Sequence, residues 1–259
     1  MIAEPGSAVL VVRDGDVVLR ECSGFADVEN RIPITPATNF RLASMTKQFT
    51  ARAIEILGVP LDEPAFRNIT VRQLLSHTSG LIDYEDLISG TEQVSDHDVL
   101  RLLEQTDRMY FEPGTQYRYS NGGYVLLGLL IERVSGKPLE QFMHDEIFAP
   151  LGMHGTVLGT ANVTNRAYGY ARENGAWVRR DQSLTSATRG DGGIYSSIDD
   201  LQKWNASLDG RTLDYGWHHG PGIVWHEGET VSFRNVIVRA EAARTTTIVL
   251  SNYIQKSLA

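Results

Sequence analysis

Alternating apolar and polar residues predict short β-strands at both ends of the chain. Near the N-terminus, Ala8–Arg13 and Val17–Ser23 flank Asp14-Gly15-Asp16, a combination typical of a β-hairpin. A second hairpin is predicted where Tyr168–Arg172 and Trp177–Arg179 flank Asn174-Gly175. Three further strand-like runs close the chain: Gly222–His226, Val231–Ala240 and Thr245–Asn252.

The middle of the chain has the periodicity of amphipathic helices instead. The clearest helix is Ala43–Leu57, which presents Phe49, Ala53 and Ile56 to a core. Ser197 and Asp200 form a capping box for a helix that runs to about Leu208. Further helices are predicted at Val71–Ser76, Val94–Gln105, Gly123–Val134 and Leu139–Phe148.

This order of elements predicts an α/β (α+β) fold in which both chain ends build one antiparallel sheet flanked by helices. A mostly helical lobe would be inserted in the middle. We expect a single domain over residues 1–259, with a sheet lobe (1–45 plus 185–259) and a helical lobe (46–184). The functional site would then lie in the cleft between the two lobes.

Composition narrows the classes of protein. The 259 residues are 42% hydrophobic and 22% charged, as in an ordinary globular protein, and the net charge of −8 argues against nucleic acid or anionic membrane as partners. The lone Cys22 excludes an internal disulfide. The apolar start is too short for a signal peptide or membrane helix, so we expect a cytoplasmic protein unless a leader was removed. The oligomeric state stays open.

A serine and a lysine one helical turn apart provide the first candidate chemistry. Ser44 and Lys47 stand in the first turn of the predicted helix, where the amine can take the hydroxyl proton. Unpaired backbone N–H groups at that helix end would favour an oxyanion. Roughly 0.3 such Ser-x-x-Lys matches are expected by chance in this chain. The alternative is a serine that only starts the helix, followed by a solvated lysine.

The second candidate element is Tyr119-Ser120-Asn121, which follows the turn Glu112–Thr115 and precedes a helix. Loops that enter helices often carry catalytic groups. Because phenols usually ionise near pH ~10, a tyrosine acts as a base at neutral pH only beside a cation, which Lys47 could supply. The alternative is that Tyr119 covers the core and Asn121 caps the helix.

The third element is His226-Glu227-Gly228-Glu229, near the C-terminus. Strand alternation places His226 and Gly228 on one face, and the glycine permits close approach of another backbone. The alternative is an ordinary strand histidine beside a glycine. Zinc bound by His226 with His218 and His219 is disfavoured because neighbouring strand residues face opposite ways, so no metal site is predicted.

These three elements, in this order, resemble the serine β-lactamase-like family. That family includes class C β-lactamases, penicillin-binding DD-peptidases, and related esterases and D-amino-acid peptidases. Further matching stretches are Thr70–Leu81, Phe111–Gly114 and Gly192–Ser197, so the resemblance extends from about Gly6 to Tyr253. The fold that it implies agrees with the fold predicted from the pattern of elements.

The resemblance implies a role for each motif residue and no cofactor. Ser44 corresponds to the acylated nucleophile, Lys47 to the amine that activates it, and Tyr119 to the tyrosine that shares in proton transfer. Asn121 would hydrogen-bond both the lysine and the substrate. The third motif would bind substrate through His226, Gly228 and Glu229, with the Glu229 backbone N–H as the second oxyanion donor.

One departure from the β-lactamase pattern bears on the substrate. His226 stands where β-lactamases usually carry the lysine of Lys-Thr-Gly, and a largely neutral imidazole holds a substrate carboxylate less firmly. We therefore expect a serine hydrolase that cleaves small esters or amides through an acyl-serine. A β-lactamase or penicillin-binding DD-peptidase-like enzyme that acts on β-lactams is the alternative. A non-enzymatic relative that binds a ligand is a third.

Overall fold

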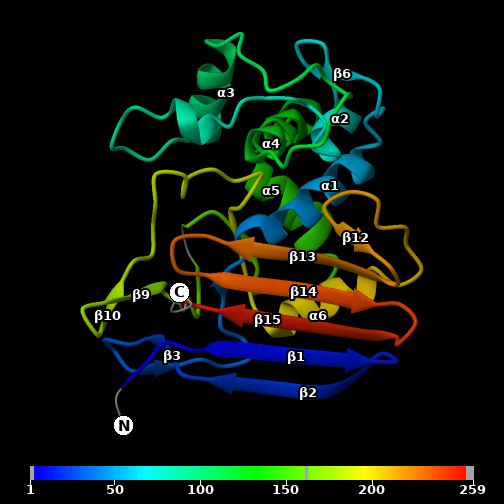
Figure 1. Ribbon diagram of the computed structural model, residues 1–259. Coiled ribbons are helices and arrows are strands. Elements are labelled where there is room, and N and C mark those ends of the chain that lie inside the picture. The colour runs from blue at the N-terminus through cyan, green and yellow to red at the C-terminus, as the bar shows by residue number, and fades with distance from the viewer. Residues whose placement is uncertain (1–2, 161–162, 255–259) are drawn as a thin grey trace.

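A six-stranded antiparallel sheet forms one side of the molecule (Figure 1). The computed structural model describes residues 3–160 and 163–254. Both chain ends contribute to this sheet, which confirms the predicted fold class. In spatial order the strands are β12 (His218–Gly220), β13 (Ile223–Glu229), β14 (Arg234–Ala240), β15 (Thr245–Ser251), β1 (Ser7–Arg13) and β2 (Asp16–Ser23).

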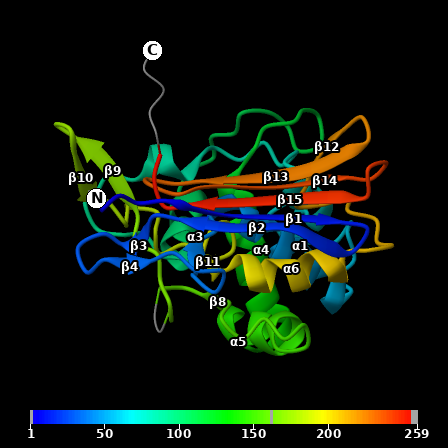
Figure 2. The same ribbon diagram turned by 90° about the horizontal axis from the view of Figure 1, so that it is seen from below.

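Strand alternation directs one face of the sheet into the core. Leu10, Ile237 and Ile248 are fully buried, whereas their strand neighbours on the other face are half-buried. Helix α6 (Ile198–Ser207) packs against β1 and β15 on the buried face, as Figure 2 shows. Half of the predicted capping box is present: Ser197 Oγ accepts from the Asp200 N–H at 3.2 Å, whereas the Asp200 carboxylate accepts from the Gly155 N–H at 2.9 Å instead of from Ser197.

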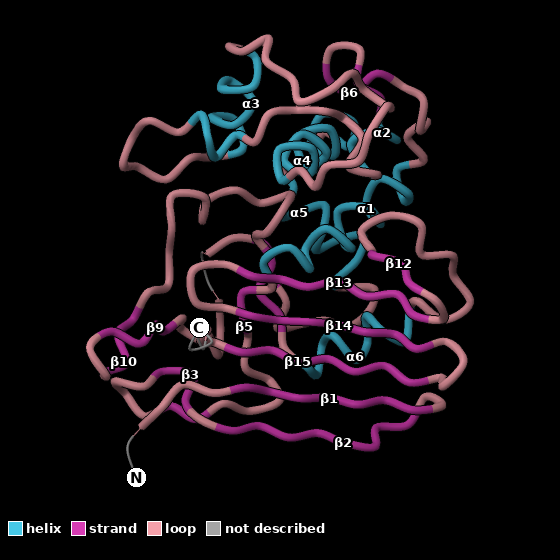
Figure 3. Tube along the Cα trace, in the orientation of Figure 1, coloured by secondary structure: helices cyan, strands magenta, loops and turns pink. Residues whose placement is uncertain are grey.

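Most of the remaining helices lie beyond the β12–β13 edge of the sheet, as Figures 1 and 3 show. The predicted helix at 43–57 starts as a 3₁₀ turn, and the one at 139–148 ends as a π turn; the others are confirmed within about three residues. The observed helical elements are η1 (Ala43–Thr46), α1 (Lys47–Leu57), α2 (Val71–Leu75), η2 (Tyr84–Leu87), α3 (Asp96–Glu104), α4 (Asn121–Ser135), α5 (Leu139–Met143) and η3 (His144–Phe148), of which η2 was not predicted. The lobe boundaries at 45/46 and 184/185 remain a proposal.

Both predicted hairpin turns are present. The central residues of each turn, Asp14 and Gly15 in one and Asn174 and Gly175 in the other, have positive φ, as a tight two-residue turn requires. Short strands complete the fold: β3 (Phe25–Asp27) with β4 (Ile32–Pro33), β6 (Pro64–Phe66) with β7 (Ile69–Thr70), β9 (Tyr170–Glu173) with β10 (Ala176–Arg179), and β5 (Phe40–Arg41), β11 (Ile194–Ser196) and β8 (Val157–Leu158) in one sheet.

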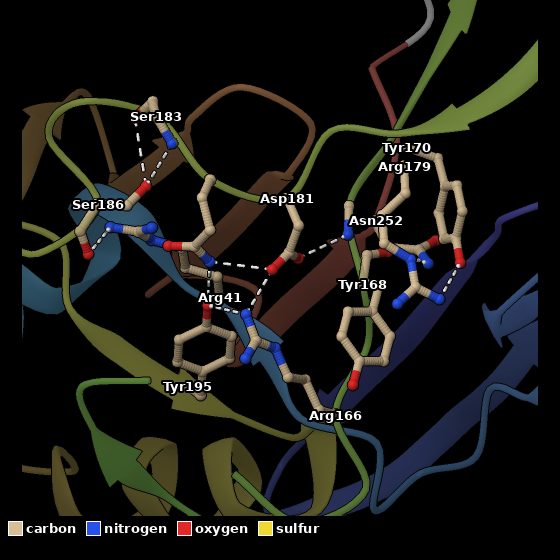
Figure 4. A network of polar contacts seen from close by, with 12 residues as sticks. Arg41, Arg166, Tyr168, Tyr170, Arg179, Asp181, Ser183, Ser186, Tyr195 and Asn252 are labelled. Carbon is tan, nitrogen blue, oxygen red and sulfur yellow. Dashed lines mark hydrogen bonds and ion pairs between the residues drawn. The ribbon is translucent and has the colours of Figure 1, made fainter. Parts of the chain in front are cut away.

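A polar network anchors the segment that follows β10 (Figure 4). Arg166 pairs with Asp181 and donates to the Tyr195 hydroxyl at 3.1 Å. The buried Arg41 donates to the carbonyl oxygen of Ser186 at 3.1 Å. Arg41 also donates to the carbonyl oxygen of Gly192 at 3.4 Å. Because Arg41 is only three residues before Ser44, its two bonds hold Ser186 and Gly192 close to the start of η1.

Candidate active site

Lys47 is fully buried at the start of α1 and lies beside Ser44 in η1. Its Nζ is 3.1 Å from Ser44 Oγ, 2.8 Å from Asn121 Oδ1 and 2.9 Å from the carbonyl oxygen of Asp191. An ammonium has three donors, and three acceptors surround it here. The structure therefore brings Ser44, Lys47 and Asn121 into direct contact.

The second element lies on the loop that enters α4. Ser120 caps this helix, since its Oγ accepts from the Gly123 N–H at 3.1 Å, so Asn121 is free to reach Lys47. The Tyr119 ring centroid is 4.9 Å from Lys47 Nζ. Its hydroxyl is buried and has no hydrogen-bond partner among the described residues. A buried phenolic hydroxyl without a partner is costly, and a bound substrate could satisfy it.

His77 positions this loop. Its ring stacks on Tyr119 at 4.4 Å between centroids, and its Nδ1 accepts from the Ser120 N–H at 3.1 Å. Burial, together with the positive charge of Lys47, lowers the pKa of His77 to about 3. The imidazole is therefore neutral, and it acts on the site as an acceptor and a stacking surface.

The third element lies on β13, whose backbone runs beside η1. A Cβ atom at Gly228 would lie 1.9 Å from the Leu42 carbonyl oxygen, so only glycine permits the β13 backbone to pass this close to Leu42. Leu42 stands two residues before Ser44. The strand extends through Glu229, three residues beyond its predicted end. The Glu229 carboxylate is 59% exposed and lies 3.7 Å from Arg234, so it points away from the site.

His226 is buried on the same face as Gly228, with its ring centroid 6.5 Å from that of Tyr119. Its Nδ1 is 2.6 Å from the carbonyl oxygen of Glu227. Because a carbonyl only accepts, Nδ1 carries the proton and Nε2 keeps a lone pair. Burial and then the positive charge of Lys47 lower the pKa of His226 to about 3, which keeps the ring neutral.

Two further titratable groups lie beside these residues; no motif in the sequence indicates Glu85, and the sequence suggests His218 only as a disfavoured zinc ligand. Glu85 in η2 accepts from Asn121 Nδ2 at 2.8 Å, and burial raises the pKa of its carboxyl. His218 lies with its ring centroid 4.9 Å from that of His226. Strand β12, which carries His218, was not predicted, and its pairing with β13 was the missing signal. Within the described residues, no cluster of three or more histidine, cysteine or acidic side chains could hold a metal ion.

Comparison with known proteins identifies the family of this chain. The family model described as beta-lactamase matches residues 1–256. The chain belongs to the beta-lactamase family. A D-aminopeptidase from Brucella anthropi, a relative within the family, is 34% identical over 229 residues, which cover 81% of this chain and 44% of that protein. The chain thus spans less than half the length of this relative.

Two solved structures extend the comparison. A penicillin-binding protein from Bacillus halodurans superposes with a TM-score of 0.86 at 26% identity and covers 96% of this chain and 91% of its own. A D-amino acid amidase from Ochrobactrum anthropi, complexed with L-phenylalanine amide, gives a TM-score of 0.80 at 26% identity and covers 96% and 86%. Among residues 3–160 and 163–254, no helix is both long and apolar enough to cross a membrane.

Proposed function

We propose that this chain is a serine hydrolase that cleaves small amides or esters through an acyl-enzyme on Ser44. The observation that carries the proposal is the buried Lys47, whose Nζ lies 3.1 Å from Ser44 Oγ while Asn121 and the Asp191 carbonyl fix its position. A nucleophile within hydrogen-bond reach of a base that a third group orients is the usual arrangement for covalent catalysis.

In the proposed reaction, Ser44 Oγ attacks the substrate carbonyl carbon while the Lys47–Tyr119 pair, which then holds one proton fewer than an ammonium and a phenol together, accepts the Ser44 proton. The Tyr119 hydroxyl, which has no partner among the described residues, then donates a proton to the leaving nitrogen or oxygen. A water molecule attacks the acyl-serine by the reverse route and releases the acid. Asn121 holds the lysine and faces the substrate.

The negative charge on the substrate oxygen would be stabilised by two backbone N–H groups. One belongs to Ser44 itself, and the other belongs to Glu229 on β13. The close contact between Gly228 and Leu42 supports this assignment, because it brings the β13 backbone up to η1. The Glu229 carboxylate would repel the oxyanion if it pointed into the site, and its exposed position beside Arg234 therefore supports the assignment.

Two groups favour a substrate that carries an amino group. The Glu85 carboxyl lies against Asn121, and the neutral His226 offers a lone pair on Nε2. Both can accept from a substrate ammonium, and a bound cation would favour ionised Glu85. The names of the relatives, D-aminopeptidase and D-amino acid amidase, point to the same chemistry. Small amides or esters of D-amino acids are therefore the proposed substrate class.

The test compares wild type with Ser44→Ala on D-phenylalanine amide, p-nitrophenyl butyrate and nitrocefin. We expect wild type to turn over the amide and the ester, and Ser44→Ala to lose about 10³-fold or more of that activity. Intact-mass analysis after treatment with a fluorophosphonate should show one adduct, absent from Ser44→Ala. Retention of most activity in the mutant would contradict the mechanism, and a wild type that prefers nitrocefin would favour the β-lactamase alternative.

A further inference from the structure

A cavity of about 660 Å³ lies on the other side of α1 from the candidate active site. Gln48, Ala51 and Glu55 recur at helical spacing and line it, whereas Lys47 and Thr50 point to the loop at 190–191. No residue of the candidate active site lines this cavity. Its volume is in the range of sites that enclose a small organic molecule.

The walls of the cavity are mostly apolar and aromatic. Facing α1 across it are Trp204 of α6, Leu208 directly after that helix, and Leu213, Tyr215 and Trp217. The charged side chains at the cavity balance one another: Arg52 and Arg211 are positive, and both lie within 3.5 Å of Glu55, while Asp214 provides a second negative charge. Two positive and two negative groups favour a neutral ligand over an ionic one.

Gln48 places one unsatisfied polar group directly behind this apolar wall. The side chain is 2% exposed, and its Oε1 accepts from Trp204 Nε1–H at 2.9 Å. Because the indole only donates, this bond fixes the orientation of the amide and leaves Nε2 as the remaining donor. Nε2 is buried and has no hydrogen-bond partner among the described residues. An unpaired buried donor is costly, so a ligand acceptor that reached it would be bound favourably.

We propose that this cavity is a second binding site, which takes a neutral, ring-containing molecule with one carbonyl acceptor for Gln48 Nε2. The aromatic walls supply the apolar contact, and the amide supplies the orientation. The site is also linked to the candidate active site by backbone packing. A Cβ atom at Gly216 would lie 2.8 Å from the Lys47 carbonyl oxygen, and the next two residues are Trp217 of the cavity and His218 beside His226.

The proposal can be tested with prodan, a neutral naphthalene dye that carries a single ketone and shifts its emission in apolar sites. We expect saturable binding of one dye per chain. Ala51→Trp and Leu213→Trp, which fill the cavity from a helix and from a surface segment, should each weaken binding by about tenfold or more. Ala243→Trp, the same change in an exposed turn, is the matched control and should leave the affinity unchanged.

Gln48→Leu tests the hydrogen bond itself. Binding of prodan should weaken about three- to tenfold, whereas binding of dimethylaminonaphthalene, which lacks the ketone, should not change. Labelling of Ser44 by a fluorophosphonate confirms that each variant is folded, and labelled wild type should still bind prodan. The proposal is overturned if both tryptophan variants that label normally bind prodan as wild type does, or if labelling of Ser44 abolishes binding.

Discussion

Gly228→Ala tests most directly whether β13 forms part of the active site. The added Cβ atom would lie 1.9 Å from the Leu42 carbonyl oxygen and 3.3 Å from the Met45 nitrogen, where contacts under 3.0 Å essentially never occur. Either β13 or η1 then has to move by roughly 1 Å, and a displacement of that size at a reacting centre costs about 10²-fold in rate. We expect kcat/KM for p-nitrophenyl butyrate to fall by about that factor.

The same strain should lower the free energy of unfolding by about 1 to 3 kcal/mol, as for other overpacked sites. Thermal melting followed by circular dichroism measures this loss, and the rate of fluorophosphonate labelling measures the nucleophile separately. Gly90→Ala is the matched control, because Gly90 has ordinary φ and its added Cβ would meet nothing closer than 4.0 Å. A folded Gly228→Ala protein that kept more than half of the wild-type kcat/KM would refute the assignment of β13 to the site.

Three further predictions concern proton transfer, specificity and pH. Lys47→Ala and Tyr119→Phe should each lower kcat far more than they raise KM, since proton transfer is realised mainly in the transition state. Steady-state kinetics measure both constants, and a change in KM alone would contradict this role. His226→Lys should raise kcat/KM for nitrocefin relative to p-nitrophenyl butyrate about ten- to a hundredfold, because a permanent charge replaces the neutral imidazole; an unchanged ratio would contradict this. The pKa of His77 and that of His226 are each about 3 in the folded state and about 6.5 in the unfolded state. At a pH between these two values the unfolded state therefore binds more protons than the folded state. The free energy of unfolding should therefore have its full value above pH ~6.5 and should decrease as the pH is lowered, by up to about 2 kcal/mol per histidine at pH ~5. Urea titration of His226→Gln should show a smaller decrease than that of the wild type.

The local parts of the site were predictable from the sequence because each depends on short-range geometry. One helical turn separates Ser44 from Lys47, and strand alternation puts His226 and Gly228 on one face. The order of strands and helices was enough for the fold class, since strands at both ends had to share one sheet. The roles of the motif residues, by contrast, came from the family resemblance and await mutagenesis.

The remaining parts of the site depend on tertiary packing that no local pattern shows. Glu85 lies in a short 3₁₀ turn without a motif of its own, and only its hydrogen bond to Asn121 brings it to the site. His218 reaches His226 through the register of a three-residue strand. The Asp191 carbonyl is a backbone group, so its side chain gave no signal. The orientation of the Gln48 amide follows from a bond to Trp204, 156 residues away.

Lys47 hydrogen-bonds groups that are far from it along the chain, so we expect the candidate site to form late in folding. Only Ser44 is local; Asn121 lies 74 positions and Asp191 144 positions away along the chain. Closing loops of that length is among the slower steps of assembly, because the entropy is lost before the contact forms. A partly folded chain with α1 already helical would therefore hold a serine beside an unanchored lysine. If Ser44 acts as proposed, its reactivity is expected only with the complete tertiary structure, and an immature chain would carry no prematurely reactive nucleophile.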